Sequence, residues 1–280
     1  MDVYTLYVIS VSRGAYVADD IAASIRWTSE KPCFAIFVDL NDGIQVLGDN
    51  GFVLMKTGLP ADAEPGFHRA AAIKWAIDQG FSFKQVISMS EDCLIIGRTL
   101  DSWALDQIAK NVGLVGVQDR LTYEDSYSSC LEMMSSWKMP HARWEVAPQT
   151  VATEFTVLSG ALAAALFQCN LLIPPGCEKW PLPYGPFISW AAQMLGHFQV
   201  SWGHQDKQMP PLYCGHPGRN AFQPAPHILA TRFLLYSSVR HAMNYSEEDL
   251  REIYKRLRGE PARVVQPLRP IVSGEGLQQQ

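Results

Sequence analysis

Residues 4–12 read Tyr-Thr-Leu-Tyr-Val-Ile-Ser-Val-Ser, a run of aromatic and β-branched residues that predicts a buried strand. Apolar residues at helical spacing follow over 16–27, and the same order then recurs along the chain. We expect further strands over 33–38, 52–56, 85–89 and 112–117, and helices over 67–79 and 100–111. Each of these strands is apolar throughout, as strands covered on both faces should be. The alternation predicts an α/β fold whose central sheet is mostly parallel and flanked by helices.

The second half of the chain is less regular. We expect a strand over 154–160, helices over 161–170 and 187–195, a strand over 198–202, a long loop over 206–226, and helices over 228–244 and from 246 onward. These last helices predict a helical C-terminal extension of one domain that covers residues 1–258. The final residues, 259–280, are rich in proline and end in three glutamines, so we expect them to be extended or disordered.

The composition excludes several classes of protein. Of the 280 residues, 48% are apolar and 18% are charged, which is typical of a globular chain and not of a disordered chain or a coiled coil. Lys and Arg number 23 against 28 Asp and Glu, so the formal net charge is −5. A broad basic face is therefore not expected, and nucleic acid is a disfavoured partner, although a local basic groove stays open.

The cysteines, the first residues and the apolar segments indicate the cellular compartment of the protein. Six cysteines occur without CxxC spacing, and the core-like settings of Cys33, Cys93 and Cys169 favour reduced thiols in a cytoplasmic protein. The chain begins Met-Asp-Val-Tyr, without the features of a signal peptide. The uncharged stretch 155–173 contains too many polar residues for a membrane span, and it predicts a buried strand followed by a buried helix.

Polar residues follow three of the predicted strands, over 10–13, 39–42 and 90–92. Because ligands of such sheets sit at the carboxyl ends of the strands, we expect the three groups to gather at one rim. Ser90-Glu91-Asp92 carries two adjacent carboxylates, which repel each other unless a cation lies between them. Mg²⁺ typically uses one or two carboxylates together with substrate phosphates, so this turn predicts a metal–diphosphate site. The alternative is a solvated turn or a helix cap formed by Asp92.

The order of these motifs resembles that of nucleotide-sugar glycosyltransferases of the GT-A fold, in a form similar to family 2. The segments that carry the resemblance are short, lie in order between about residues 4 and 204, and cover 7–13, 22–25, 36–42, 68–74, 86–94 and 155–160. The resemblance implies a nucleotide-binding half over about 1–117 and an acceptor half over about 118–258. It also implies transfer of a sugar from a nucleoside diphosphate sugar to a hydroxyl acceptor, assisted by Mn²⁺ or Mg²⁺.

The resemblance implies roles for individual residues on the donor side. Ser10, Ser12 and Arg13 would lie beside the nucleotide. Asp39 matches the acid that contacts the base or the ribose. Arg69 matches the basic residue near the diphosphate.

The resemblance also implies a metal site. Asp92 matches the last acid of the family's Asp-x-Asp motif and would hold the metal, with Glu91 and His204 as further donors. Imidazole is an ordinary ligand for such an ion. Ser90 stands where the family has the first acid, so it would face the donor without binding the metal strongly, and a weak or absent metal stays open.

The catalytic base is the point at which the chain departs from the family. Many inverting members carry an acid after a Tyr-Gly-like turn before a late helix, whereas this chain reads Tyr-Gly-Pro-Phe over 184–187. Glu178 is the nearest substitute, Glu154 and Asp206 are further candidates, and retaining chemistry without this base is also open. Tyr184 could stack on a sugar or a base, the alternative being packing within its loop.

Two rival functions follow from the same residues. The missing acid is consistent with a catalytically inactive, nucleotide-binding GT-A-like protein. A nucleotidyltransferase on a related sheet would need a glycine-rich basic loop after the first strand, and Ser12-Arg13-Gly14 is short for this role. The chain has no GxGxxG, P-loop or GxSxG motif, so nicotinamide, ATPase and α/β-hydrolase functions are not indicated.

Overall fold

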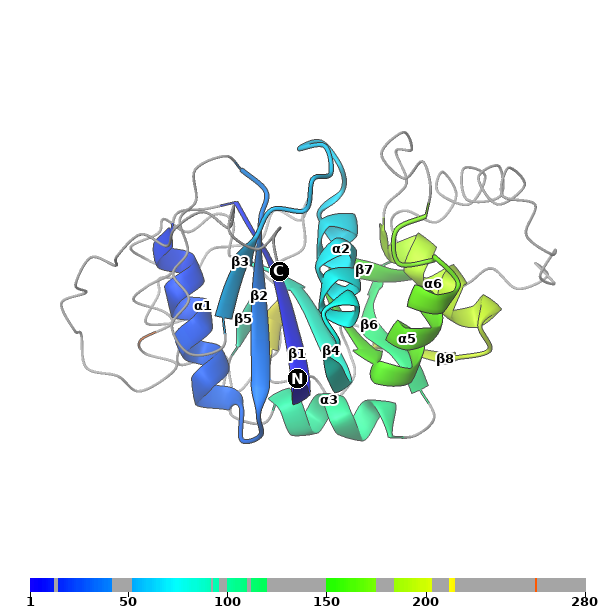
Figure 1. Ribbon diagram of the computed structural model, residues 1–280. Coiled ribbons are helices and arrows are strands. Elements are labelled where there is room, and N and C mark those ends of the chain that lie inside the picture. The colour runs from blue at the N-terminus through cyan, green and yellow to red at the C-terminus, as the bar shows by residue number, and fades with distance from the viewer. Residues whose placement is uncertain are drawn as a thin grey trace.

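The computed structural model describes residues 1–12, 15–41, 52–91, 93–95, 100–109, 112–119, 150–174, 184–202, 212–214 and 255. Seven strands form a central sheet in the order β3-β2-β1-β4-β7-β6-β8 (Figure 1). They are β1 (Asp2–Val11), β2 (Cys33–Asp39), β3 (Phe52–Met55), β4 (Ser82–Ser90), β6 (Val112–Asp119), β7 (Thr150–Ser159) and β8 (Phe198–Trp202). A small second sheet pairs β5 (Cys93–Ile95) with β9 (Leu212–Cys214).

The sheet is mostly parallel, as the sequence predicts. Strand β1 pairs in parallel with both β2 and β4, and the pairs β2–β3 and β6–β8 are parallel as well. Strand β7 is antiparallel to its neighbours β4 and β6. A strand that is covered on both faces is apolar in either direction, so the sequence pattern contained no signal for this reversal.

In the part of the chain that the structure describes, five helices cover the sheet: α1 (Ala15–Thr28), α2 (Pro65–Asp78), α3 (Leu100–Ile108), α5 (Gly160–Gln168) and α6 (Tyr184–Met194). They match the helices predicted over these regions, and stretch 155–173 is a strand followed by a helix as expected. None of the helices that the structure describes combines the length and the hydropathy needed to span a bilayer. The structure does not describe the expected helix over 228–244 or the tail over 259–280. It describes only Lys255 of the helix expected from 246 onward.

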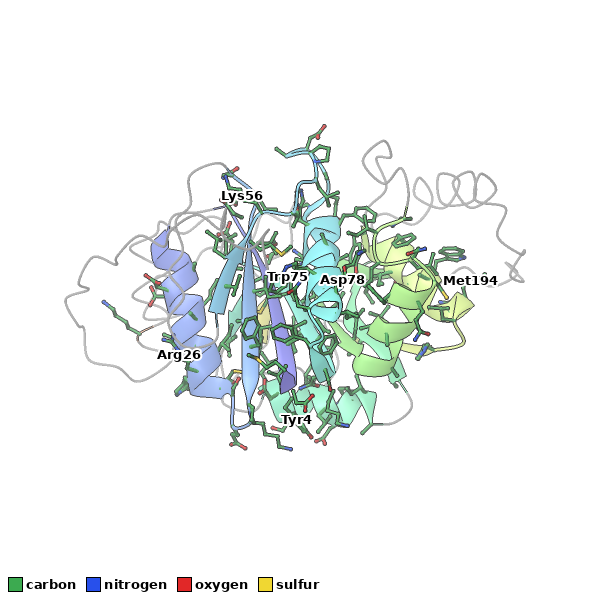
Figure 2. The ribbon with its side chains drawn as sticks, in the orientation of Figure 1. Tyr4, Arg26, Lys56, Trp75, Asp78 and Met194 are labelled. Carbon is green, nitrogen blue, oxygen red and sulfur yellow. The ribbon has the colours of Figure 1, made fainter. Side chains whose placement is uncertain are left out.

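Two hydrophobic layers hold the helices against the sheet. Tyr7, Ile9 and Val11 of β1 belong to a cluster with α1 and α3, whereas Leu6 and Val8 belong to a second cluster with α2, α5 and α6. This division follows from the strand geometry, in which successive side chains point to opposite faces. The molecule therefore has three layers, with exposed charged side chains such as Arg26 and Lys56 at its periphery (Figure 2).

A buried polar network ties α3 to the sheet. The Tyr7 hydroxyl donates to the Asp101 carboxylate, and the Gln85 side-chain amide donates to Thr5 Oγ1 at 3.0 Å and to the Asp101 backbone oxygen at 2.9 Å. All four residues are at most 5% exposed. Burial raises the pKa of the Asp101 carboxyl above its ordinary value. Buried polar groups need such partners, because an unsatisfied group loses its hydration without compensation.

The junction of β7 and α5 explains the Ser-Gly pair at residues 159 and 160. The Ser159 hydroxyl accepts a hydrogen bond from the Leu162 amide at 3.1 Å and so caps α5. A Cβ atom on Gly160 would lie 2.2 Å from the backbone oxygen of Phe83 in β4. Both residues of the pair therefore have a structural role in docking α5 on the sheet.

We predict that Gly160→Ala lowers the free energy of unfolding by about 1–3 kcal/mol, because the new methyl group meets backbone that cannot move aside. Ala164→Ser, at an exposed position of the same helix, should cost about 0.5 kcal/mol or less. Urea denaturation followed by circular dichroism measures both. Equal stability of Gly160→Ala and the wild type would contradict the close approach of α5 to β4.

Candidate functional site

The carboxyl ends of β1, β2 and β4 form one rim of the sheet. The parallel register sets Ser10 of β1 beside Ser90 of β4, and Val11 of β1 beside Asp39 of β2. Beyond the end of β4, the Glu91 amide donates to the Ser10 backbone oxygen at 3.0 Å. The polar groups that the sequence predicted to share a rim are thus adjacent wherever the structure describes them.

Arg69 joins helix α2 to this rim from inside the protein. Its Nη1 atom donates to the Ser10 hydroxyl at 2.6 Å, and its Nε atom donates to the Ser88 hydroxyl at 3.0 Å. The residue is only 1% exposed. A guanidinium group presents several donors in a fixed fork, so one side chain can bridge two neighbouring strands.

Ser12 is fastened to the ends of both flanking strands. Its backbone amide donates to Glu91 Oε1 at 2.9 Å, and its hydroxyl donates to the same oxygen. Its backbone oxygen accepts from Asn41 Nδ2 at 2.7 Å. The Asn41 backbone amide in turn donates to Asp39 Oδ1 at 2.9 Å. The chain leaving β1 is therefore fixed at Ser12 before it reaches Arg13.

Glu64 connects the amino ends of α2 and α6. Its Oε2 atom accepts from the amides of Gly66 and Tyr184, both at 3.1 Å. The Tyr184 ring packs edge-on against Phe67 with centroids 5.3 Å apart, and a Cβ atom on Gly66 would lie 2.4 Å from that ring. Tyr184 is 1% exposed, and burial raises the pKa of its hydroxyl. Of the two expectations for Tyr184, packing is therefore the correct one and stacking on a ligand is wrong.

His68 fastens the segment between β3 and α2. Its Nδ1 atom lies 2.6 Å from Thr57 Oγ1, and its Nε2 atom lies 3.1 Å from the Pro60 backbone oxygen. The residue is 3% exposed, and burial lowers the pKa of its imidazole. A neutral ring that donates from Nε2 and accepts at Nδ1 satisfies both contacts.

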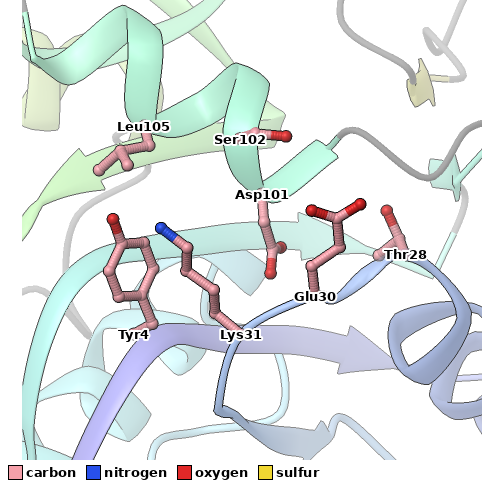
Figure 3. A pocket seen from close by; sticks show the side chains of 7 residues that line it. All are labelled: Tyr4, Thr28, Glu30, Lys31, Asp101, Ser102 and Leu105. Carbon is pink, nitrogen blue, oxygen red and sulfur yellow. The ribbon is translucent and has the colours of Figure 1, made fainter.

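A small pocket lies at the amino ends of β1 and β2, away from the rim (Figure 3). Lys31 and Tyr4 both line this pocket, and the Lys31 ammonium group lies over the Tyr4 ring, 4.0 Å from its centroid. The cavity has a volume of about 30 Å³. This holds about two water molecules and is far too small for a nucleotide. The pocket is therefore not a candidate for the binding site predicted above.

The predicted site residues divide into two groups. Six of them lie at the rim or directly behind it: Ser10, Ser12, Asp39, Arg69, Ser90 and Glu91. The side chains of the others lie outside the described part of the structure, although the backbone of Glu154 belongs to β7: Arg13, Asp92, Glu154, Glu178, His204 and Asp206. Among the residues that the structure does describe, no three His, Cys, Asp or Glu side chains are grouped for a metal ion. The metal and base assignments therefore stay predictions.

Two residues that hold the rim and the helices behind it, Ser88 and Glu64, were missed by the sequence analysis. Ser88 is a polar residue inside an apolar strand, and Arg69 is a basic residue in the alanine-rich helix 65–78. These two exceptions to apolar segments were a signal in the sequence that the side chains pair. Glu64 directly precedes Pro65, a common arrangement at the start of a helix. Asn41 belongs to the group 39–42 that the sequence predicted at the rim, but its bond to Ser12 had no signal in the sequence.

No protein-family model matches the chain, and no curated protein matches its sequence. Solved structures to which it is similar include mouse xyloside xylosyltransferase 1 in its apo form, at 9% identity over 72% of this chain and 85% of that one, with a TM-score of 0.42. Glucosyl-3-phosphoglycerate synthase from Mycobacterium tuberculosis, in complex with Mn²⁺, UDP and glucosyl-3-phosphoglycerate, is 14% identical over 72% and 70%, with a TM-score of 0.41.

A mannosyltransferase from Pyrobaculum calidifontis, in complex with GDP-Man and Mn²⁺, is 12% identical over 72% of this chain, with a TM-score of 0.37. The match spans about half of that protein's length, 55%. These structures belong to glycosyltransferases, the class that the sequence motifs resemble. The residues at the strand ends, rather than this distant likeness, carry the proposal of function made below.

We predict that Arg69→Lys lowers the free energy of unfolding by about 1–3 kcal/mol, because one ammonium group cannot reach Ser10 and Ser88 as the two arms of the fork do. Arg26→Lys, on the exposed side of α1, should stay within about 0.5 kcal/mol of the wild type. Urea denaturation followed by tryptophan fluorescence compares them. Equal losses in the two variants would show that Arg69 does not bridge the strands.

The lowered pKa of His68 predicts a dependence of stability on pH. The unfolded chain, with an ordinary pKa of 6.5, binds the proton more tightly than the folded protein. The free energy of unfolding should therefore fall as pH falls through this value toward the lowered pKa of the folded state. His68→Gln should lose less stability than the wild type between pH 7.5 and pH 5.5, measured by urea denaturation at each pH. Identical losses would contradict a buried, neutral His68.

Proposed function

We propose that the protein is a glycosyltransferase that moves a sugar from a nucleoside diphosphate sugar to a hydroxyl acceptor. The observation that supports it most strongly is the rim, at which Ser12, Asp39 and Glu91 follow three adjacent strands that run in parallel. Open α/β sheets bind ligands at the carboxyl ends of their strands. A fixed serine and a carboxylate at that rim suit the polar groups of a nucleoside, and the acidic turn suits a diphosphate when a cation lies between them.

The donor would lie across the ends of β1, β2 and β4. Asp39 would accept hydrogen bonds from the base or the ribose, and Ser12 and Arg13 would line the nucleotide. Ser10 is 2% exposed and accepts from Arg69, so it would lie behind the nucleotide rather than against it. Arg69 is enclosed at 1% exposure and donates to Ser10, so it would act on the diphosphate through its charge rather than by direct contact. A fixed positive charge behind the rim favours an anionic ligand in front of it.

Asp92 follows β4 and His204 follows β8 in the sequence, and carboxylate oxygen and imidazole nitrogen both suit a divalent cation. Asp92, with His204 as a further donor, would hold Mn²⁺ or Mg²⁺. The sequence also named Glu91 for the ion, but its Oε1 atom accepts from Ser12 in the structure. When bound, the ion would neutralise the charge that develops on the leaving diphosphate. Ser90, the last residue of β4, carries no charge and lies beside Ser10 of β1.

The acceptor half would supply the group that removes the proton of the acceptor hydroxyl. Glu178 and Asp206 are the candidates for this general base, because carboxylates commonly perform proton transfer in such reactions. The half over about 118–258 would form the acceptor wall of a single domain over 1–258, ahead of the tail over 259–280. We assign the protein to the cytoplasm, where cysteine thiols stay reduced. Cys33, Cys93 and Cys169 form no disulfide in this structure, although Cys169 is exposed and does not have the core setting that its sequence predicted.

A nucleotide-binding protein without transfer activity is the second candidate. It is favoured by the first turn of α6, which begins Tyr184-Gly185-Pro186 and contains no carboxylate of its own. Two experiments separate the candidates. Calorimetry measures the binding of nucleoside diphosphates in the presence of MnCl₂, and a turnover assay measures the release of nucleoside diphosphate from the corresponding nucleoside diphosphate sugars. Binding without release or transfer in the presence of varied hydroxyl acceptors would favour the second candidate.

We predict that one nucleoside diphosphate among UDP, GDP, ADP, CDP and dTDP raises the melting temperature in the presence of Mn²⁺. A ligand at a hundred times its Kd adds about 2.7 kcal/mol of stability, enough to be seen in a thermal-shift assay. Asp92→Asn should remove the part of the shift that depends on Mn²⁺. The control Asp78→Asn, at an exposed ion pair with Lys74, should leave it unchanged. The proposal would be refuted if no nucleoside diphosphate raised the melting temperature of the wild type. It would also be refuted if Asp92→Asn kept the whole of the Mn²⁺-dependent rise.

A further inference from the structure

We propose that Glu91 is a positioning residue, which holds Ser12 in a preformed conformation at the donor site and is not needed as a metal ligand. This inference rests on the function proposed above and divides the two acids that follow β4 between two tasks. Glu91 would set the chain that leaves β1, and Asp92 would carry the metal. The sequence alone assigned both acids to the ion.

The first step is the path of the Glu91 side chain. Its backbone amide donates to the Ser10 oxygen at 3.0 Å, which continues the pairing of β4 with β1. Its carboxylate then reaches Ser12, whose amide and hydroxyl both donate to one atom, Oε1. Two donors from one residue therefore converge on a single oxygen. A cation would have to compete with both of them for that oxygen.

The second step is the electrostatic state of the carboxylate. Glu91 is 4% exposed, and a buried charge is costly unless donors compensate for the lost hydration. Hydrogen bonds to an ionised group are roughly twice as strong as those between neutral groups. The Ser12 donors thus stabilise the buried carboxylate, and the carboxylate in turn fixes the backbone and the rotamer of Ser12.

The third step is the opposite side of Ser12. Its backbone oxygen accepts from Asn41 Nδ2 at 2.7 Å, so the amide, the hydroxyl and the carbonyl of Ser12 each have a hydrogen bond. Ser12 is nevertheless exposed to solvent. An exposed residue with every polar group fixed is ordered before a ligand arrives, which lowers the entropy that binding must overcome. The contact of Glu91 with Ser12 is therefore suited to preorganise the nucleotide side of the rim.

Matched variants separate positioning from metal binding. Glu91→Gln keeps an oxygen that can accept from Ser12 but removes the charge, whereas Glu91→Ala removes both. The probes are the diphosphate identified by the thermal-shift screen and MnCl₂. Calorimetry gives the Kd of the diphosphate at saturating Mn²⁺, and manganese electron paramagnetic resonance gives the Kd of Mn²⁺ at saturating diphosphate.

We expect Glu91→Gln to stay within about threefold of the wild type in both constants, since it keeps the hydrogen bonds to Ser12. Glu91→Ala should weaken the diphosphate about tenfold or more, because it removes the oxygen that accepts both hydrogen bonds from Ser12. Ser12→Ala should weaken it as well, and Glu91→Ala with Ser12→Ala should be no weaker than Glu91→Ala alone. Asp92→Asn serves as the comparison, because it should weaken Mn²⁺ directly.

A rise of the Mn²⁺ Kd in Glu91→Gln as large as that in Asp92→Asn would overturn the inference, as would additive losses in the double variant. If the wild type binds none of the diphosphates, the proposed function fails, and amide hydrogen exchange at Ser12 then decides the positioning role alone. Slow exchange in the wild type and Glu91→Gln with fast exchange in Glu91→Ala supports it. Equal exchange in the three proteins overturns it.

Discussion

The parallel pairing of β1 with both β2 and β4 is the constraint on which the rest of the structure depends. It brings three strand ends to one level, so that Ser10 lies beside Ser90 and Val11 lies beside Asp39. The apolar side chains of β1 bury both faces of the strand, and Ser10 and Ser12 present polar groups at its carboxyl end. Side chains that are remote in the sequence become neighbours there without any need for a flexible loop to bring them together.

The rim is held from behind by one buried cation and from the side by one buried carboxylate. Arg69 ties β1 to β4 through Ser10 and Ser88, and Glu91 ties the end of β4 to Ser12. Each charge is enclosed, and hydroxyl and amide groups compensate for its lost hydration. Glu64 adds a third connection, between α2 and α6, so that the helix behind the rim is also fixed against the second half of the chain.

The sequence was sufficient for the seven strands of the central sheet, the five described helices and the position of the rim, because an apolar run followed by polar residues is a local signal. It was insufficient for the direction of β7, since a doubly covered strand has the same composition whichever way it runs. It also missed the contact between Glu64 and the Tyr184 amide, whose residues are 120 positions apart, and assigned Tyr184 a possible stacking role that its burial excludes. Short strands such as β9 were hidden within an expected loop, because three residues carry too little pattern.

The central claim is that a nucleoside diphosphate and a divalent cation bind at the ends of β1, β2 and β4. A crystal structure of the protein grown with its preferred diphosphate and MnCl₂, with anomalous data collected for manganese, tests it most directly. The account predicts an anomalous peak at the Asp92 carboxylate, with the diphosphate between the peak and Ser12 and the nucleoside toward Asp39. A peak at another part of the molecule, or a nucleotide remote from these strand ends, would contradict it.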